Sequence, residues 1–260
     1  MRYFAAALLF PVCAYAIEIP KGLSEPDRVE VVETIGLGSA PKMLTNPYPL
    51  GGYSGFEVGY SVEFINIRNV NRLGCSPGTG GCANTHTPEE DEFRFSRITI
   101  GKGLYHDVDL FFEFAPPVGS TTISDYGGLL RYAFYQSEFL PLTLSAVLHG
   151  NRMNVQDAFV SQNVGAELMV GITVDNFALY FGGGQIWAKG TFLAQPSTGS
   201  PGDGTVDPSD PAISNGNVNE YATVTHAVVG FSVQFQDLFA AGEIDHYKDS
   251  VYSLKLGARF

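Results

Sequence analysis

The chain has 260 residues and a formal net charge of −12, and it has no basic stripe that could neutralise phosphates, which excludes a nucleic-acid partner. Its composition combines 30 glycines and 13% aromatic residues with only 16% charged residues. Charge this sparse is unusual for a soluble acidic protein and suits a protein wall with one face in lipid.

The first sixteen residues have the pattern of a cleaved signal peptide. Arg2 supplies a short positive region, residues 3–12 are apolar, and Ala14-Tyr15-Ala16 provides the small-x-small sequence before cleavage. The apolar run is shorter than the roughly 20 residues that a membrane-spanning helix needs. We therefore expect export and cleavage after Ala16. Cys13 falls inside the removed segment, so no lipid anchor is expected.

Residues 17–52 do not alternate between polar and apolar side chains. Ser24-Glu25-Pro26-Asp27 predicts a helix start, and Gly36 predicts its end. Val32 and Ile35 would then share one face of the helix. Two interpretations of this N-terminal segment stay open: a plug in the lumen of a barrel formed by residues 53–260, or a segment outside the lumen, as a periplasmic extension or an extra strand.

From residue 53 onward the dominant period is two, which indicates β-strands with one apolar face and one polar face. In the first segment Val58 and Tyr60 alternate with Glu57 and Ser61. The same pattern predicts ten strands, near 53–68, 92–105, 107–115, 126–136, 141–150, 159–174, 177–190, 218–235, 238–247 and 250–260. Eight or twelve strands are the alternatives.

Strand length and loop length favour a membrane barrel over a soluble sandwich. Soluble strands average roughly 5–6 residues, whereas membrane barrel strands need about 9–11. Short turns are predicted at 106–107, 137–141, 175–176 and 236–237, and longer loops at 69–91, 116–125, 150–158 and 191–217. This asymmetry predicts an all-β fold, an antiparallel transmembrane β-barrel with short periplasmic turns and long extracellular loops.

Two predicted strands depart from the regular pattern. In segment 92–105, Phe93 and Phe95 share one parity while Ile98 and Ile100 share the other, which predicts a β-bulge near Ser96-Arg97. Segment 177–190 contains Gly182-Gly183-Gly184, which predicts a weak strand or the close approach of a neighbour.

Two cysteines follow the predicted signal peptide, Cys75 and Cys82, in a turn-rich stretch. Outside the cytoplasm such a pair predicts a disulfide, because a zinc site would need two further ligands and His86 offers only one. The acids of loop 191–217 match no calcium-binding spacing and are interpreted as solvated. Loops 69–91 and 191–217 are the expected places for surface partners.

The last eleven residues, Ser250 to Phe260, resemble the C-terminal strand of bacterial outer-membrane β-barrel proteins. Such strands end in an aromatic residue and carry apolar residues at every second position, as do Tyr252, Leu254, Leu256, Ala258 and Phe260 here. The resemblance implies that the barrel-assembly machinery reads this strand and that the chain resides in outer-membrane lipid. It identifies no subfamily.

The polar parity of the strands predicts which side chains line the lumen. The predicted lining residues are Glu57, Glu63, Asp109, Glu113, Arg131, His149, Glu167, His226, Glu243, Asp245, Lys255 and Arg259, with Arg94 or Arg97 depending on the bulge. These acids and bases must pair or hold water, because an unpaired buried charge is costly.

Three functions are compatible with such a lumen. The favoured hypothesis is a narrow channel or passive transporter for small solutes, with a mildly cation-favouring lining because acids outnumber bases. The rival is a structural or surface-interaction barrel whose salt-bridged lumen is closed. An outer-membrane hydrolase is disfavoured, because no residue set meets the geometric requirements for a nucleophile and its base. No catalytic residue, metal ligand or cofactor is predicted.

Overall fold

The computed structural model describes residues 19, 23–70, 73, 92–105, 107–115, 123–137, 139–193 and 217–260. The predicted signal peptide and the predicted disulfide between Cys75 and Cys82 lie outside these described residues, as do most of loops 69–91 and 191–217.

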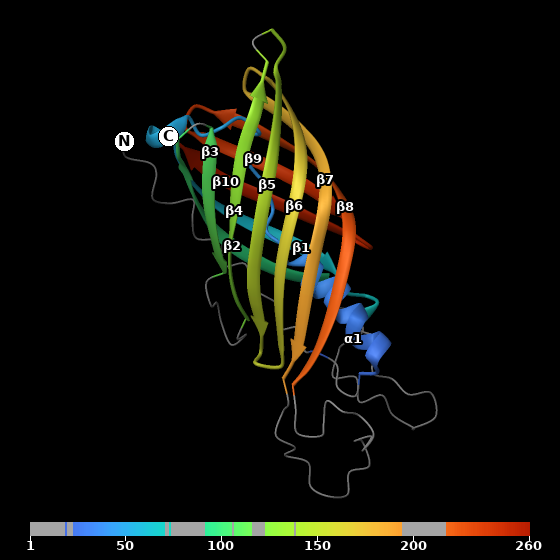
Figure 1. Ribbon diagram of the computed structural model, residues 1–260. Helices are drawn as coiled ribbons and strands as arrows, with labels where there is room; N and C mark the ends of the chain where they lie inside the picture. Colours follow the sequence, from blue (N-terminus) through green and yellow to red (C-terminus); the bar gives the residue numbers. More distant parts are fainter. Residues whose placement is uncertain are drawn as a thin grey trace, which may run out of the picture.

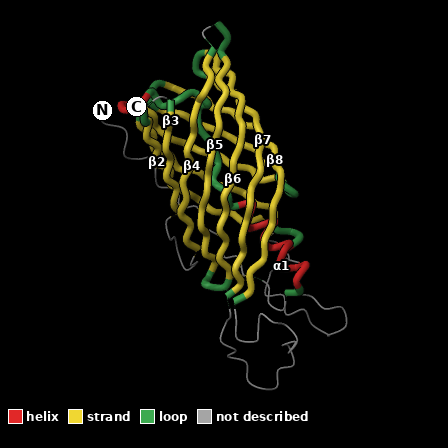
Figure 2. The backbone as a smooth tube through the Cα atoms, viewed as in Figure 1, coloured by secondary structure: helices red, strands yellow, loops and turns green. Residues whose placement is uncertain are grey.

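Ten antiparallel strands close into one barrel, as Figures 1 and 2 show. The strands are β1 (Phe56–Asn66), β2 (Glu92–Gly103), β3 (Val108–Ala115), β4 (Ile123–Gln136), β5 (Leu142–Val155), β6 (Phe159–Val174), β7 (Phe177–Phe192), β8 (Val218–Phe235), β9 (Leu238–His246) and β10 (Ser250–Arg259). Each strand pairs with its neighbours in sequence, and β1 pairs with β10 to close the wall. The predicted barrel and its strand number are confirmed.

The closing seam joins the two ends of the barrel sequence. Phe56 and Phe260 exchange backbone hydrogen bonds of 3.0 and 2.8 Å, and the register runs from Glu57 opposite Arg259 to Ile65 opposite Val251. Tyr252, Leu254, Leu256 and Phe260 are all more than half exposed on the outer face. The C-terminal strand therefore presents its apolar parity outward.

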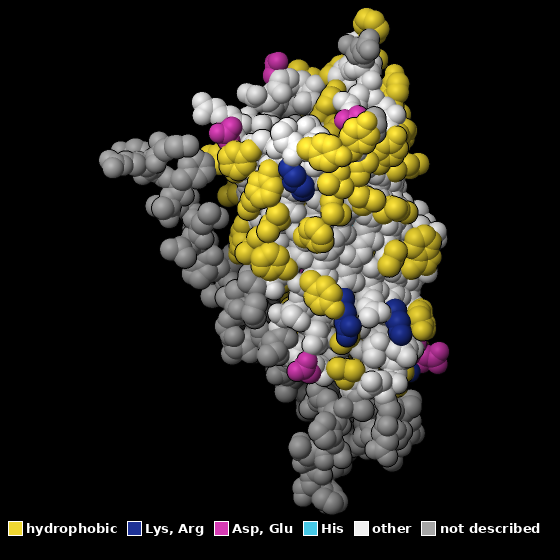
Figure 3. Space-filling view, turned by 60° about the vertical axis from the view of Figure 1, so that its left-hand side comes forward, with side chains coloured by type: hydrophobic (Ala, Val, Ile, Leu, Met, Phe, Trp, Pro, Cys, Tyr) yellow, Lys and Arg dark blue, Asp and Glu magenta, His cyan; other side chains and the backbone are white. Residues whose placement is uncertain are grey.

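The barrel has an inverted distribution of polarity. Large apolar side chains, such as Leu168 and Leu256, are exposed on the outer wall, while charged side chains, such as Arg97 and Arg131, are fully buried inside. On the face drawn in Figure 3, hydrophobic side chains gather over much of the wall with few charged ones among them. Such a wall suits hydrocarbon outside, because strands that close into a barrel pair their backbone polar groups with one another.

The predicted bulge near Ser96-Arg97 is wrong. β1 and β2 pair without interruption from Phe56 opposite Lys102 to Asn66 opposite Glu92. Phe93, Phe95 and Arg97 all point inward and are at most 2% exposed. The odd-numbered residues of β2 therefore face inward along the whole strand, and the inner face becomes apolar at one end of the barrel. The irregular register lies elsewhere, between Ala133 and Tyr135.

One helical segment precedes the strands. It consists of α1 (Glu25–Val31), a π-helical turn η1 (Val32–Gly36) and, after an irregular stretch, a 3-10 turn η2 (Gly52–Ser54). Ser24 caps α1, since its side chain accepts from the Asp27 N–H while Asp27 accepts from the Ser24 N–H. The predicted helix start is confirmed. None of the described helices is both long and apolar enough to cross a membrane.

Candidate functional site: the filled lumen

Residues 23–50, the plug segment, run through the inside of the barrel from one end to the other. Near the long loops, Arg28 of α1 pairs with Glu220 at 2.8 Å, and Lys248 in the β9–β10 turn contacts Glu30 and Glu33. At the opposite end, Gly51 and Gly52 take left-handed φ angles of 92° and 71°, which favour glycine, and connect the segment to β1. In Figure 1, α1 lies at the end of the barrel opposite to the C-terminus.

The first part of the plug segment packs through apolar contacts. Val31, Val32 and Ile35 are fully buried and belong to one cluster with the inward side chains of Phe93 and Phe159. The inner wall is apolar at this end because it meets an apolar helix face. This contact explains why the apolar residues of segment 92–105 change from odd to even positions along the sequence.

Arg97 holds the middle of the plug segment. Its guanidinium lies 2.6 Å from Glu63 and 2.5 Å from Asp125, and it donates to the carbonyl oxygens of Ser39 and Ala40. All three charged side chains are at most 1% exposed. One cation therefore compensates two buried carboxylates and also satisfies backbone acceptors that have no strand partner.

Two asparagines extend this network along the wall. Asn151 donates to the Ser39 carbonyl and Asn163 donates to the Gly36 carbonyl, at 2.7 and 2.6 Å. Asn163 also donates to the side-chain oxygen of Asn151 at 2.9 Å. These amides serve the C-terminal turn of the helical segment, whose last carbonyl groups lack a helical partner.

The second half of the plug segment has no regular secondary structure and is fixed by Arg131 and Arg259. Arg131 lies 2.7 Å from Asp109 and donates to the carbonyl oxygens of Asn46 and Tyr48. Arg259 donates to the Tyr48 carbonyl at 2.9 Å and to the Pro49 carbonyl. The wall thus supplies donors to an irregular segment that pairs with no strand.

Carboxylates of the wall accept from the same segment. Asp109 accepts from the Leu50 N–H at 3.0 Å, and Glu243 accepts from the Leu44 N–H at 3.1 Å. Glu57 pairs with Lys255 at 2.8 Å and accepts from the Thr45 hydroxyl.

A separate group surrounds Lys42, the buried cation of the plug segment. Its ammonium lies 3.0 Å from Asp245 and 2.5 Å from the hydroxyl of Tyr247. Asp245 in turn lies 2.9 Å from Nδ1 of His226, whose ring stacks on Tyr247. Glu167 approaches both His149 and His226, at 2.8 and 3.4 Å.

Every residue of the predicted lining is on the inner side of the wall. Eleven of the twelve named residues make an ion pair or a hydrogen bond given above, and Glu113 lies 3.7 Å from Arg97. The structure resolves the alternative in β2, because Arg97 points inward and Arg94 is exposed beside Glu92. The lining residues contact the plug segment or one another rather than a water-filled path.

Sequence reasoning missed several members of the site. The sequence predicts a loop at Asp125, although β4 begins at Ile123, and Lys42 lies in a stretch without alternation. Tyr247 shares the inward parity of Glu243 and Asp245 in the predicted strand 238–247, so that signal could have found it. Asn151 was assigned to a loop because β5 continues beyond the predicted strand end to Val155. Asn163 shares the inward parity of its strand, so that signal could have found it.

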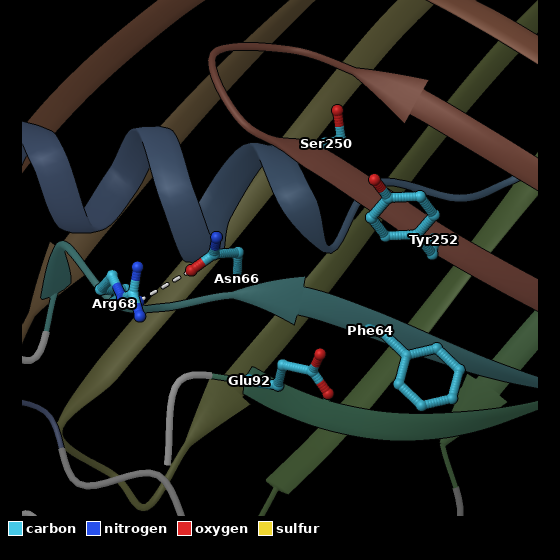
Figure 4. A pocket seen from close by; sticks show the side chains of 6 residues that line it. All are labelled: Phe64, Asn66, Arg68, Glu92, Ser250 and Tyr252. Carbon is cyan, nitrogen blue, oxygen red and sulfur yellow. Dashed lines mark hydrogen bonds between the residues drawn. The ribbon is translucent and has the colours of Figure 1, made fainter. Parts of the chain in front are cut away.

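At the outer surface, a shallow depression of about 440 Å³ is lined by Phe64, Asn66, Arg68, Glu92, Ser250 and Tyr252. Figure 4 shows these side chains at the ends of β1, β2 and β10, where the Arg68 N–H donates to Asn66. The depression contains none of the lumen residues. We therefore assign the candidate functional site to the filled lumen.

Comparison with known proteins adds only distant structural likenesses. No family model and no curated protein sequence matches the chain. The N-terminal β-barrel domain of Pseudomonas aeruginosa OprF is 10% identical, with 80% of this chain and 99% of that chain covered and a TM-score of 0.36. A loop-deleted OmpT of Vibrio cholerae is 12% identical, with 78% of this chain and 62% of that chain covered and a TM-score of 0.30. Ail of Yersinia pestis, solved with the heparin analogue sucrose octasulfate, is 12% identical, with 79% of this chain and 97% of that chain covered and a TM-score of 0.29.

Proposed function

We propose that this chain is a bacterial outer-membrane β-barrel whose own plug segment closes the lumen, and that it acts as a structural or surface-interaction barrel. The outer-membrane assignment is supported by the apolar outer wall and by the C-terminal strand with its outward apolar parity. Its long loops, 69–91 and 191–217, would then meet surface partners, because the filled interior offers solutes no path.

One observation carries the closed-lumen proposal. The wall donors Arg97, Arg131 and Asn151 are bonded to backbone carbonyls of the plug segment, and their side chains are at most 8% exposed. A standing channel needs such polar side chains to face water and permeating ions. Here they face the protein's own backbone, which favours the closed barrel over the narrow channel that the sequence alone favoured.

A hydrolytic function is less well supported. His149, a histidine of the predicted lining, has a side chain with no exposed surface. A lipid or peptide substrate could not reach it while the plug segment is in the lumen. Within the described lumen, the geometry therefore supplies no base that a substrate could reach.

The proposal is tested by single-molecule conductance in planar bilayers with three forms of the refolded chain from residue 17. The unaltered form is expected to give no reproducible current steps. A form that lacks residues 17–50 is expected to conduct, because its charged lining would face water. Heat-modifiable gel mobility would verify that each form has folded as a barrel.

A disulfide-locked form supplies the matched control. A Cβ on Gly36 would lie 3.8 Å from the Cβ of Ala188, which is about the mean separation in disulfides. Gly36→Cys with Ala188→Cys should therefore fix the plug segment to β7. Steady steps in the unaltered form that persist in the locked form would overturn the closed lumen. Steps that vanish on locking and return on reduction would instead support a channel gated by the plug segment.

A further inference from the structure

We infer that His149, Glu167 and His226 form a binding site for one divalent transition-metal ion of the zinc type inside the barrel wall. The ligand atoms of the three side chains all lie within 4.8 Å of one another. Nε2 of His149 and Nε2 of His226 lie 2.8 and 3.4 Å from the same carboxylate oxygen of Glu167. Ligand atoms at a tetrahedral zinc ion are separated by roughly 3.4 Å, given bonds of about 2.0–2.1 Å.

The ring nitrogens at this site are short of hydrogen bonds. Nε2 and Nδ1 of His149 and Nε2 of His226 are buried and make no hydrogen bond with the described residues. The 2.8 Å contact between His149 and Glu167 is close, but its geometry is not that of an aligned N–H donor. Buried nitrogen lone pairs without a donor are costly, and a metal ion would satisfy them.

A second carboxylate orients one of the ligands. Asp245 lies 2.9 Å from Nδ1 of His226, so that Nδ1–H can donate to it and leave the Nε2 lone pair directed toward Glu167. Asp245 is itself held by Lys42 and by the hydroxyl of Tyr247 at 3.1 Å. Metal-binding histidines are commonly fixed by such a carboxylate. Glu167 and Asp245 also supply two negative charges for a dication.

Glycines make room for the three ligands. His149 on β5 faces Gly165 on β6, where a Cβ would lie 2.3 Å from Nε2 of His149. Glu167 on β6 and His226 on β8 both face Gly184 on β7. Because Gly184 has no side chain, the two ligands can meet across β7. The glycine run at 182–184 thus allows the close approach that its sequence predicted.

The chemistry of the ligand set selects the class of metal. Two imidazoles and one carboxylate suit zinc and the neighbouring first-row divalent ions. Calcium and magnesium prefer an all-oxygen shell. A bound ion would link β5, β6 and β8 and would act through Asp245 on Lys42 of the plug segment. Because the site is sealed, the ion would enter as the barrel folds.

The test uses the untagged chain from residue 17 with Cys75→Ser and Cys82→Ser, so that thiolates contribute no zinc site. This protein is refolded with Zn²⁺, dialysed, and assayed for metal by mass spectrometry. We expect one Zn²⁺ per chain, and at least a tenfold lower content after His149→Gln or His226→Gln. His246→Gln is the matched control, because His246 is exposed on the outer face of β9 and should leave the metal content unchanged.

Refolding with Co²⁺ gives a readout that does not depend on the variants. The ion should show the intense visible absorption of a four-coordinate site in the unaltered histidine background. Absence of retained Zn²⁺ or Co²⁺ in that background would overturn the proposal, as would equal retention after His149→Gln and His226→Gln. Failure here leaves the closed lumen intact, since the conductance test requires no metal.

Discussion

At the residue scale, the interior depends on buried charges that are each matched by a partner. Arg97 is the clearest case, because its guanidinium lies within 2.6 Å of both Glu63 and Asp125. Replacing a buried ion pair by apolar residues can be neutral, but removing one partner leaves an uncompensated charge. Whether a substitution here lowers the free energy of unfolding therefore depends on whether it leaves a buried charge without its partner.

Arg97→Ala is expected to lower the free energy of unfolding by about 3–5 kcal/mol, since Glu63 and Asp125 would be left buried without their cation. Urea unfolding of the barrel in lipid vesicles would measure the change. Arg94→Ala is the matched control: Arg94 lies on the outside of the same strand, 42% exposed and 2.9 Å from Glu92. Its loss should cost at most about 1 kcal/mol. Equal losses for the two variants would contradict the assignment of Arg97 to the interior.

The identity of the lining could be predicted from parity, but its partners could not. Alternation places Arg131 and Asp109 on the inner face without saying that the guanidinium also reaches the backbone of residues 46 and 48. Lys42 has no periodic neighbours at all. Its role depends on the path of an irregular segment, which short-range sequence patterns do not determine.

At the element scale, the helical segment is attached at the mouth of the barrel by the β9–β10 turn. Lys248 lies 2.9 Å from Glu33 and contacts Glu30. Its hydrogen bonds to Glu30 and Glu33 raise the pKa of Lys248 to about 12. Because this folded-state pKa is above the ordinary value of 10.5, the stabilisation is fully present below that value and is lost as the pH rises through about 12.

Lys248→Met should loosen α1 without unfolding the barrel. The lysine is 47% exposed, so its ion pairs contribute at most about 1 kcal/mol. We expect hydrogen exchange of the α1 amides at neutral pH to become up to about fivefold faster, as that free energy implies. Lys189→Met removes the same charge from the outer wall, where Lys189 lies over the Tyr221 ring, and should leave α1 exchange unchanged. Unchanged exchange in both variants would exclude the turn as an attachment point.

The elements themselves were largely predictable, and the exceptions have one physical cause. β6 and β8 have the predicted bounds, whereas β5 extends to Val155 and contains inward Met153. At the end of the barrel near α1 the outer face carries exposed polar side chains such as Arg152 and Gln162, and the inner face meets the apolar plug helix. The polarity of the two faces is therefore reversed there. A prediction that assumes apolar side chains on the outer face then ends the strand too early, as in β5, or introduces a bulge, as in β2.

At the scale of the whole molecule, the barrel and the plug segment are one folding unit. The wall is closed by the β1–β10 seam, and its interior is filled from the long-loop end to Gly51 by residues that precede the first strand. An empty barrel of ten strands would leave a narrow lumen lined by charges. The wall charges pair chiefly with one another, and the plug segment adds Lys42 and backbone groups that hydrogen-bond to them, so closing the lumen also stabilises the wall.

The two placements of residues 17–52 that the sequence left open differ in whether the segment contacts β7. The described residues 23–50 lie in the lumen, where a Cβ on Gly36 would be 3.8 Å from that of Ala188. The most direct test is the yield of a spontaneous disulfide between Gly36→Cys and Ala188→Cys in isolated outer membranes, measured by mass spectrometry in a Cys75→Ser, Cys82→Ser background. We predict nearly complete cross-linking for this pair and none when the second cysteine replaces the outward-facing Trp187. Free thiols in the Gly36–Ala188 pair, in a barrel that is otherwise folded, would contradict a lumen closed by its own N-terminal segment.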